Sequence, residues 1–194
     1  MDYARSADIP TALKIVIAGG FGVGKTTTVG AVSEISPLTT EAEMTSLSVG
    51  VDDLGGVEKA TTTVAMDFGR VTIDSALKLY LFGTPGQNRF GFMWDGLARG
   101  ALGSVVVVDS RRLDDCHPAV DYFERSGLPF IIAVNAFDGR LAHDLPEIRW
   151  ALAVDDAVPV VAFDARDRGS VRDILLVLLD LALAAAYRAR AGQR

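Results

Sequence analysis

The sequence predicts one α/β domain with a six-stranded, mostly parallel sheet, helices on both faces and one antiparallel edge strand. Three observations predict it. Short apolar runs rich in Val and Ile alternate with segments of helical length. The first run, at 13–19, leads into a glycine-rich loop, and two early runs lie close enough to pair as antiparallel strands. With 194 residues, of which 49% are apolar and 23% charged, the chain can build one complete core.

Each expected strand is an apolar run bounded by turn residues, and each expected helix is a longer segment between two such runs. Strands are expected at 13–19, 63–73, 77–83, 104–110, 129–135 and 159–165. Helices are expected at 25–34, 87–99, 114–126, 141–152 and 171–191. The strands at 63–73 and 77–83 form the antiparallel pair. From Ser36 to Thr63, Thr, Glu, Gly and Asp dominate, which predicts a long and functional loop.

We expect residues 13–190 to form the domain, between tails at 1–12 and 191–194. The start of the chain lacks the apolar core of a signal peptide, and the apolar run at 174–187 is too short to span a bilayer. Cys116 is the one cysteine, so no internal disulfide is expected.

The net charge is −6, and no Lys/Arg cluster suits nucleic acid. A cytoplasmic protein that reaches membranes at most through partners is expected.

The stretch GGFGVGKT, residues 19–26, satisfies the phosphate-binding pattern G-x-x-x-x-G-K-[ST]. Its glycines let backbone N–H groups surround a phosphate chain at the start of the following helix. Lys25 is expected to reach the β and γ phosphates, and Thr26 to bind Mg²⁺. The predicted phosphate-binding set is Gly20, Phe21, Gly22, Val23, Gly24, Lys25, Thr26 and Thr27.

Asn135 and Asp138, in VNAFD, follow an apolar strand at the sheet edge where ligands bind. A carboxylate at Asp138 can accept hydrogen bonds from N1–H and the 2-amino group of guanine, whereas adenine has no donor at either point. The next strand ends in DAR, where the Ala165 N–H is a candidate donor to guanine O6 and Arg166 is a further expected nucleotide-binding residue. The pattern favours GTP over ATP, although an ordinary Asn/Asp turn would contain the same residues.

A third motif, LFGTPGQ, follows the second strand of the antiparallel pair. Gly86 can present its N–H to a γ-phosphate, and Gln87 can orient an attacking water. A Thr-Pro-Gly turn is also common by itself.

In this order, GGFGVGKTT, TTTVAMDFG, FGTPGQ, NAFD and DAR resemble the Ras-like small GTPases over nearly the whole chain. More closely, IVIAGGFGVGKTTTVGAVSEISPLTTE and TTTVAMDFG resemble the bacterial small GTPases of actinobacterial conservon operons, which are related to the polarity GTPase MglA. The resemblance implies GTP or GDP with Mg²⁺, hydrolysis of GTP, and a switch that changes shape. It also implies a roadblock-type partner and a histidine-kinase-like sensor.

Three positions depart from the family pattern. Gly83 stands where the family has the aspartate that opens its DxxGQ motif, and Asp67 on the neighbouring strand is the candidate metal ligand instead. Ala136 replaces the usual lysine, which should weaken guanine binding without erasing selectivity. Phe21 replaces a glycine, and its ring should crowd the space used by Gln87 and by an arginine finger.

Thr63 matches the family's switch threonine, with Thr62 as the alternative. The resemblance therefore implies the metal set Thr26, Thr63 and Asp67 and the catalytic set Gln87, Lys25 and Thr63. Arg89 is the nearby candidate for an arginine finger in cis, and a partner is the candidate in trans. Slow hydrolysis is expected.

Two other functions stay open. A P-loop ATPase of the ParA/SRP-like type fits GKTTT, with Asp109 at the end of the strand SVVVVD as its acidic residue. A scaffold locked to its nucleotide fits the three departures. Arg111 and Arg112 are expected in an ordinary loop rather than facing a nucleotide or a partner, and Trp94 and Trp150 in the core or an interface.

Overall fold

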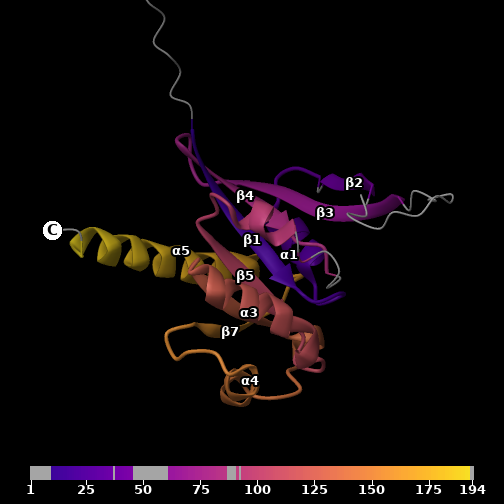
Figure 1. Cartoon of the computed structure of the whole chain (residues 1–194), viewed down its shortest axis with the longest axis vertical. Coiled ribbons are helices and arrows are strands. Elements are labelled where there is room, and N and C mark those ends of the chain that lie inside the picture. Colours follow the sequence, from indigo (N-terminus) through magenta and orange to yellow (C-terminus); the bar gives the residue numbers. More distant parts are fainter. Residues whose placement is uncertain (1–9, 37, 46–60, 87–90, 92, 193–194) are drawn as a thin grey trace, which may run out of the picture.

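The computed structural model describes residues 10–36, 38–45, 61–86, 91 and 93–192 (Figure 1). The strands are β1 (Thr11–Gly19), β2 (Leu38–Thr45), β3 (Thr61–Thr72), β4 (Leu77–Gly83), β5 (Gly103–Val108), β6 (Phe130–Asn135) and β7 (Val160–Phe163). The helices are α1 (Lys25–Val32), α2 (Trp94–Ala98), α3 (His117–Ser126), α4 (Leu145–Leu152) and α5 (Arg168–Ala191). Short 3-10 turns lie at η2 (Leu113–Cys116) and η3 (Phe137–Gly139).

The strands form one sheet in the order β2-β3-β4-β1-β5-β6-β7. Strands β4, β1, β5, β6 and β7 are parallel, and β3 runs antiparallel to both of its neighbours. The predicted α/β class, the antiparallel pair and the helices on both faces are confirmed. Because the five parallel strands point the same way, the loops that follow them meet at one edge of the sheet.

The sheet has one strand more than the predicted six. Residues 38–45, expected within a long loop, form β2 and pair with β3 from Leu38–Phe68 to Thr45–Thr61. The prediction that β3 is the edge strand is therefore wrong, because β3 lies between β2 and β4. The signal was present, because the sequence LTTEAEMT alternates between two residue sets, L-T-A-M and T-E-E-T. Its two glutamates made it read as a loop, although charged residues are common on edge strands.

Two apolar cores lie on either side of the sheet, and β1 contributes to both. Ile15 and Ile17 lie in the core covered by α1 and α5, whereas Val16 and Ala18 lie in the core covered by α2, α3 and α4. All four side chains are fully buried. A strand buried on both faces reads as a continuous apolar run, which is why β1 was predictable.

The helices differ from expectation mainly at their ends. Helix α2 spans only Trp94–Ala98 of the expected 87–99, of which 87–90 and 92 lie outside the described residues. Gly91 and Gly96 make this segment a poor helix former. Helix α4 begins with a capping box, in which Asp144 accepts from the Glu147 N–H at 2.8 Å.

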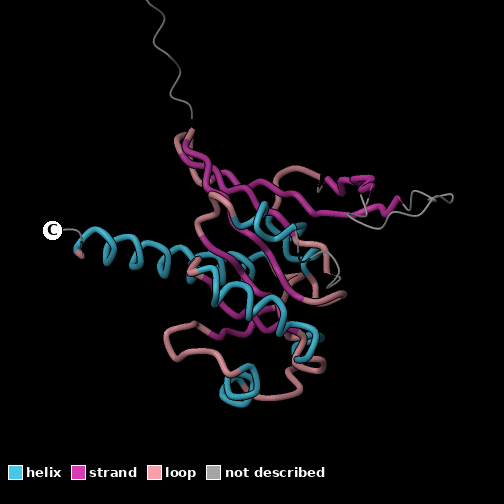
Figure 2. The backbone as a smooth tube through the Cα atoms, viewed as in Figure 1, coloured by secondary structure: helices cyan, strands magenta, loops and turns pink. Residues whose placement is uncertain are grey.

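Helix α5 runs out past the sheet (Figure 2). No helix among the residues just given is long and apolar enough to cross a membrane.

Candidate functional site

Four loops meet at the carboxyl edge of the parallel strands. They are the P-loop after β1, the turn at 84–86 after β4, η3 after β6 and the DAR loop after β7. A pocket of about 400 Å³ opens here beside the P-loop. Its lining residues are Phe21, Gly22, Gly24, Lys25, Thr26, Thr27, Asp67, Thr84, Pro85 and Gly86.

The P-loop path depends on glycine. Gly19, Gly22 and Gly24 have φ values of 133°, 72° and 109°, which other residues rarely adopt. A Cβ at Gly19 would collide with the Val107 carbonyl oxygen, and a Cβ at Gly24 would lie 2.7 Å from Nδ2 of Asn135. The loop therefore packs directly against the sheet edge at these glycines.

Lys25 is the cation of the pocket. Its side chain is 8% exposed, and Nζ donates to the carbonyl oxygens of Gly19 at 3.0 Å and Gly20 at 2.5 Å. Burial lowers the pKa of Lys25 to about 8, while the negative charge of Asp67 acts in the opposite direction. The ammonium group is thus held at the inner surface of the loop, in a place where an anion would favour its charged form.

Asp67 stands beside the hydroxyl of Thr26. Thr26 Oγ1 donates to Asp67 Oδ2 at 2.7 Å, and Asp67 is 9% exposed. Asp67 pairs with Gly83 across the β3–β4 ladder. A Cβ at Gly83 would lie 2.9 Å from both Cβ and Oδ2 of Asp67. The missing side chain at Gly83 therefore makes room for the Asp67 carboxylate, so the departure at Gly83 and the position of Asp67 are linked.

The donor atoms in this corner suit a hard cation. Thr26 and Asp67 offer hydroxyl and carboxylate oxygens, which Mg²⁺ prefers. Thr84, 3% exposed, also lines the pocket, and its Oγ1 has no hydrogen-bond partner within the described part of the chain. The same part of the chain contains no group of three or more His, Cys, Asp or Glu residues suited to a metal. Mg²⁺ needs no such cage, because it usually keeps waters and binds substrate phosphates.

Asn135 fastens three loops together. Its side chain is buried, its Nδ2 donates to the Val23 carbonyl at 3.0 Å, and its Oδ1 accepts from the Ala165 N–H at 3.1 Å. The P-loop and the DAR loop are therefore held in fixed relation by one amide. The Ala165 N–H, predicted to reach guanine O6, is engaged within the protein here, so that contact stays a prediction that requires sharing or release of this hydrogen bond.

Asp138 projects from η3 into solvent. It adopts a left-handed conformation, with φ 54°, and its side chain is 89% exposed. Arg166 Nη1 donates to Asp138 Oδ1 at 3.2 Å, and the same guanidinium pairs with Asp164 at 3.1 Å. The predicted base-reading carboxylate is thus accessible, and a cation from the DAR loop holds it in position.

Phe21 and Gly86 mark where the P-loop approaches the third motif. A Cβ at Gly86 would lie 2.7 Å from Lys25 Nζ and 2.9 Å from Phe21 Cα, so this turn lies against the loop. The Phe21 side chain is 68% exposed. Gln87 and Arg89 lie outside the described residues.

Thr62 and Thr63 lie within β3, where they pair with Met44 and Glu43. Thr63 precedes Asp67 by four residues, which is about 13 Å along a strand. The structure therefore does not bring Thr63 to the Thr26–Asp67 corner. A metal-binding or catalytic Thr63 stays a prediction, and it requires the first residues of β3 to follow another path.

Sequence reasoning missed the group of charges after β5. Asp109 is 1% exposed. Arg111 donates to its carboxylate through Nε and Nη2, both at 2.8 Å. Arg112 Nε lies 3.5 Å from Asp109 Oδ2. The hydrogen bonds from Arg111 hold the pKa of Asp109 below its usual value. Arg112 Nη2 also donates to the Phe21 carbonyl at 3.2 Å. The Asp-Ser-Arg-Arg run was the available signal, because a buried Asp needs a cation nearby.

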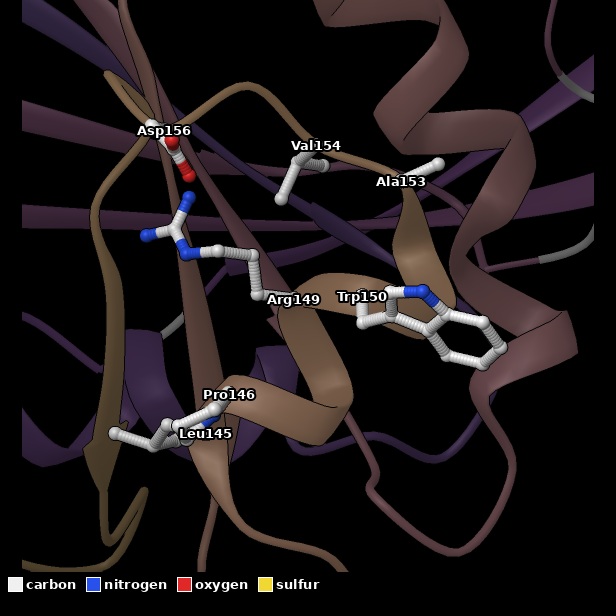
Figure 3. Close-up of a pocket in the computed structure, with 7 residues that line it drawn as sticks. All are labelled: Leu145, Pro146, Arg149, Trp150, Ala153, Val154 and Asp156. Carbon is white, nitrogen blue, oxygen red and sulfur yellow. The ribbon is translucent and has the colours of Figure 1, made fainter.

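A second, wider pocket of about 590 Å³ lies along α4 (Figure 3). Arg149 extends along it toward Asp156, and its guanidinium donates to the backbone carbonyls of Asp155 and Val158. Trp150 turns to the other side and is 85% exposed. With its arginine committed to backbone carbonyls, this pocket has fewer groups to hold an anion than the P-loop pocket.

The fold and the P-loop pocket together define a nucleotide-binding P-loop protein with the architecture of a G domain. The chain belongs to the family described as conserved hypothetical ATP binding protein, which it matches over residues 17–185. An uncharacterized protein from Methanocaldococcus jannaschii is 31% identical over 128 residues, which cover 65% of this chain and 71% of that protein.

Two solved structures share the architecture. The G domain of the FeoB iron transporter from T. maritima gives a TM-score of 0.58 at 18% identity, covering 89% of this chain and 99% of that one. The FeoB G domain from Methanococcus jannaschii gives 0.57 at 16% identity, covering 88% and 98%. At such identities the similarity shows the fold alone. The conservon and MglA relation is not among these findings and stays a prediction.

Proposed function

We propose that the protein binds GTP and GDP together with Mg²⁺ and acts as a molecular switch that hydrolyses GTP slowly. The observation that carries the proposal is the Asn135 bridge, which joins the P-loop to the DAR loop beside Asp138. A phosphate-binding loop and a carboxylate suited to guanine are thereby held at one sheet edge. Such an arrangement lets one ligand engage both.

Guanine is favoured over adenine by the chemistry of Asp138. Its carboxylate can accept from N1–H and the 2-amino group of guanine, and Arg166 keeps it oriented through Oδ1. An adenine in the same position would offer the carboxylate no N–H at either point, which favours guanine. Ala136 leaves the base without the usual lysine cover, so we expect modest affinity.

Mg²⁺ would be held by Thr26 and Asp67, in the pocket that Thr84 also lines. Bound there, it would neutralise charge on the β and γ phosphates. Lys25 would act on the same oxygens from the inner side of the loop. The contact between Thr26 and Asp67 and the space at Gly83 support this assignment.

In the proposed reaction, water adds to the γ-phosphorus, the bond to the β–γ bridging oxygen breaks, and GDP, phosphate and a proton are released. Gln87 would orient the water. The approach of the Phe21 Cα to the turn that leads to Gln87 supports a slow intrinsic rate, about 10⁻⁴ to 10⁻³ s⁻¹ as for unaided Ras-type enzymes. A partner would then accelerate the step. A roadblock-type protein and a histidine-kinase-like sensor stay predictions from the resemblance, and the comparisons indicate neither.

A second candidate is ATP binding, which the family description favours. The sequence pattern for this function predicts Asp109 as the acidic residue beside the metal. Asp109 is instead paired with Arg111 and Arg112, and the carboxylate at the Thr26 hydroxyl is Asp67. An ATPase would therefore have to use Asp67, with Asp138 playing no part in reading the base.

Titration of the purified protein with GDP and ADP tests the base. We expect GDP to bind at least tenfold tighter, about 1.4 kcal/mol, and Asp138→Asn to shift preference toward xanthosine diphosphate. Equal affinities for GDP and ADP would contradict the GTPase proposal. Single-turnover assays with GTP then give the rate: Gln87→Leu should abolish hydrolysis, and Phe21→Gly should raise the rate reached with a stimulating partner.

A further inference from the structure

The P-loop is held from outside the pocket by a residue of another strand's loop. Arg112 follows β5, and its Nη2 donates to the Phe21 carbonyl at 3.2 Å. The same nitrogen lies 3.6 Å from the point where a Cβ would stand on Gly22. Arg112 does not line the pocket that Phe21 and Gly22 help to form. It therefore contacts the loop from outside the pocket lining.

Arg112 is itself fixed at two further points. Its Nε lies 3.5 Å from Asp109 Oδ2, and its Nη1 lies 3.4 Å from Asp115 Oδ2. Asp109 is buried, and a Cβ on Gly20 would lie 2.7 Å from the Asp115 Cβ, so η2 also packs against the loop. A guanidinium has a planar fork of donors, which suits simultaneous contacts of this kind.

The contact with the Phe21 carbonyl sets the direction of an amide hydrogen. The peptide between Phe21 and Gly22 is trans, so its C=O and N–H point in opposite directions. With the C=O held toward Arg112, the Gly22 N–H points away from Arg112, and Gly22 is itself one of the residues that line the pocket. Gly22 sits at φ 72° between two other left-handed glycines, a backbone that can rotate this peptide with little steric resistance.

We propose that Arg112 is a positioning residue of the P-loop, which holds the Phe21–Gly22 peptide so that the Gly22 N–H faces the phosphate chain of the bound nucleotide. The inference rests on the proposed nucleotide-binding function but not on the choice of base, because GDP and ADP share the diphosphate. Arg111, by contrast, binds the same Asp109 but lies over the Phe137 ring, 4.2 Å from its centroid.

The test compares wild type with Arg112→Ala and Arg112→Lys, each titrated with GDP and with ADP in excess Mg²⁺. Arg172→Ala serves as control, because Arg172 also forms an exposed ion pair, with Asp173 at 2.9 Å on α5. We expect Arg112→Ala to weaken binding of the preferred nucleotide about tenfold, or about 1.4 kcal/mol. Arg112→Lys should recover part of the loss, since a lysine can reach one acceptor but not three, and Arg172→Ala should match wild type.

Two further measurements separate positioning from other causes. The melting temperature of Arg112→Ala without nucleotide should stay within about 2 °C of wild type; a fall in parallel with affinity would make Arg112 merely structural and overturn the proposal. The loss should persist between about 0.05 and 0.5 M salt, whereas a general charge effect is screened at the higher concentration. Disappearance of the loss at high salt would also overturn the proposal.

Wild-type affinity in Arg112→Ala would overturn it directly. If the wild type prefers ADP, the base assignment is contradicted, and Arg112 is then tested by the affinity of the variants for ADP. A wild type that binds neither nucleotide contradicts both proposals.

Discussion

Lys25 carries its charge in a site that is nearly closed to water, and this makes its contribution to stability depend on pH. Burial lowers its pKa from 10.5 to about 8. Between these values the unfolded chain binds a proton that the folded protein does not, so stability rises with pH across this window. The gain is about 3 kcal/mol, since each unit is 1.36 kcal/mol.

The prediction is checked by urea unfolding of wild type and Lys25→Met at a series of pH values without nucleotide. The difference in unfolding free energy should move in favour of wild type above pH 8 and level off near 10.5. Other titrating groups cancel in this difference. A constant difference would show that Lys25 is as charged in the folded protein as in the unfolded chain.

Thr84 differs from Lys25 in that its side chain is neutral, so its effect on stability comes from a buried hydroxyl and not from a charge. Its Oγ1 is without a hydrogen bond among the residues that the structure describes. An unpaired buried hydroxyl costs about 1–3 kcal/mol. Thr84→Val should therefore raise the unfolding free energy of the nucleotide-free protein by about 1 kcal/mol in urea, while it weakens retention of Mg²⁺ and nucleotide.

Thr28 provides the matched control for Thr84. It is fully buried, but its Oγ1 donates to the Gly24 carbonyl at 2.9 Å. Thr28→Val removes a satisfied hydrogen bond and should lower stability. If both valine variants are less stable than wild type, the Thr84 hydroxyl has a partner in the folded protein.

At the scale of elements, the β3–β4 ladder determines where a carboxylate can stand. Asp67 and Gly83 are cross-strand partners, and side chains larger than hydrogen at both positions collide. Gly83 is not among the glycines with positive φ, so an aspartate fits its backbone. Gly83→Asp alone should lower the unfolding free energy by about 1–3 kcal/mol through overpacking, with charge repulsion added.

Exchanging the pair should restore the site. The double variant Asp67→Gly with Gly83→Asp returns one carboxylate to the same corner from β4 instead of β3. We expect Mg²⁺-dependent slowing of GDP release, measured with and without EDTA, to be lost in Asp67→Gly and largely recovered in the exchange. An exchange no better than Asp67→Gly would show that only β3 presents the carboxylate correctly.

For the whole molecule, most of the fold was predictable because its strands are buried on both faces. In runs such as Phe130–Asn135 every residue is buried, so the strand appears in the sequence as a continuous apolar run. Strand β2 was missed because it reads as polar and its pairing with β3 is set by tertiary structure rather than by local sequence. The length of α2 was overestimated because it was inferred from the spacing between two strands. The glycines of that segment, Gly91 and Gly96, disfavour a longer helix.

Part of the candidate site was predictable in its residues, but its contacts were not. The sequence identified Lys25, Thr26 and Asn135 through motifs, and Asp67 through resemblance. Nothing local indicated that Gly83 makes room for Asp67, because the two meet only when β3 and β4 pair. Arg112 was undervalued for the same reason: it lies 91 residues from Phe21, and only the fold brings its guanidinium to that carbonyl.

The two tryptophans differ in exposure to solvent and should therefore differ in fluorescence emission. Trp94, the first residue of α2, is 6% exposed and packs edge-on against Tyr122, whereas Trp150 on α4 is 85% exposed. Trp150→Phe should remove the red-shifted, iodide-quenchable part of the emission and leave a single buried fluorophore. That fluorophore lies in the element that follows the GTPG turn along the chain. Its emission in the single-tryptophan protein should therefore change on adding GTP if the switch reaches α2, and a signal indifferent to nucleotide would place α2 outside the moving part.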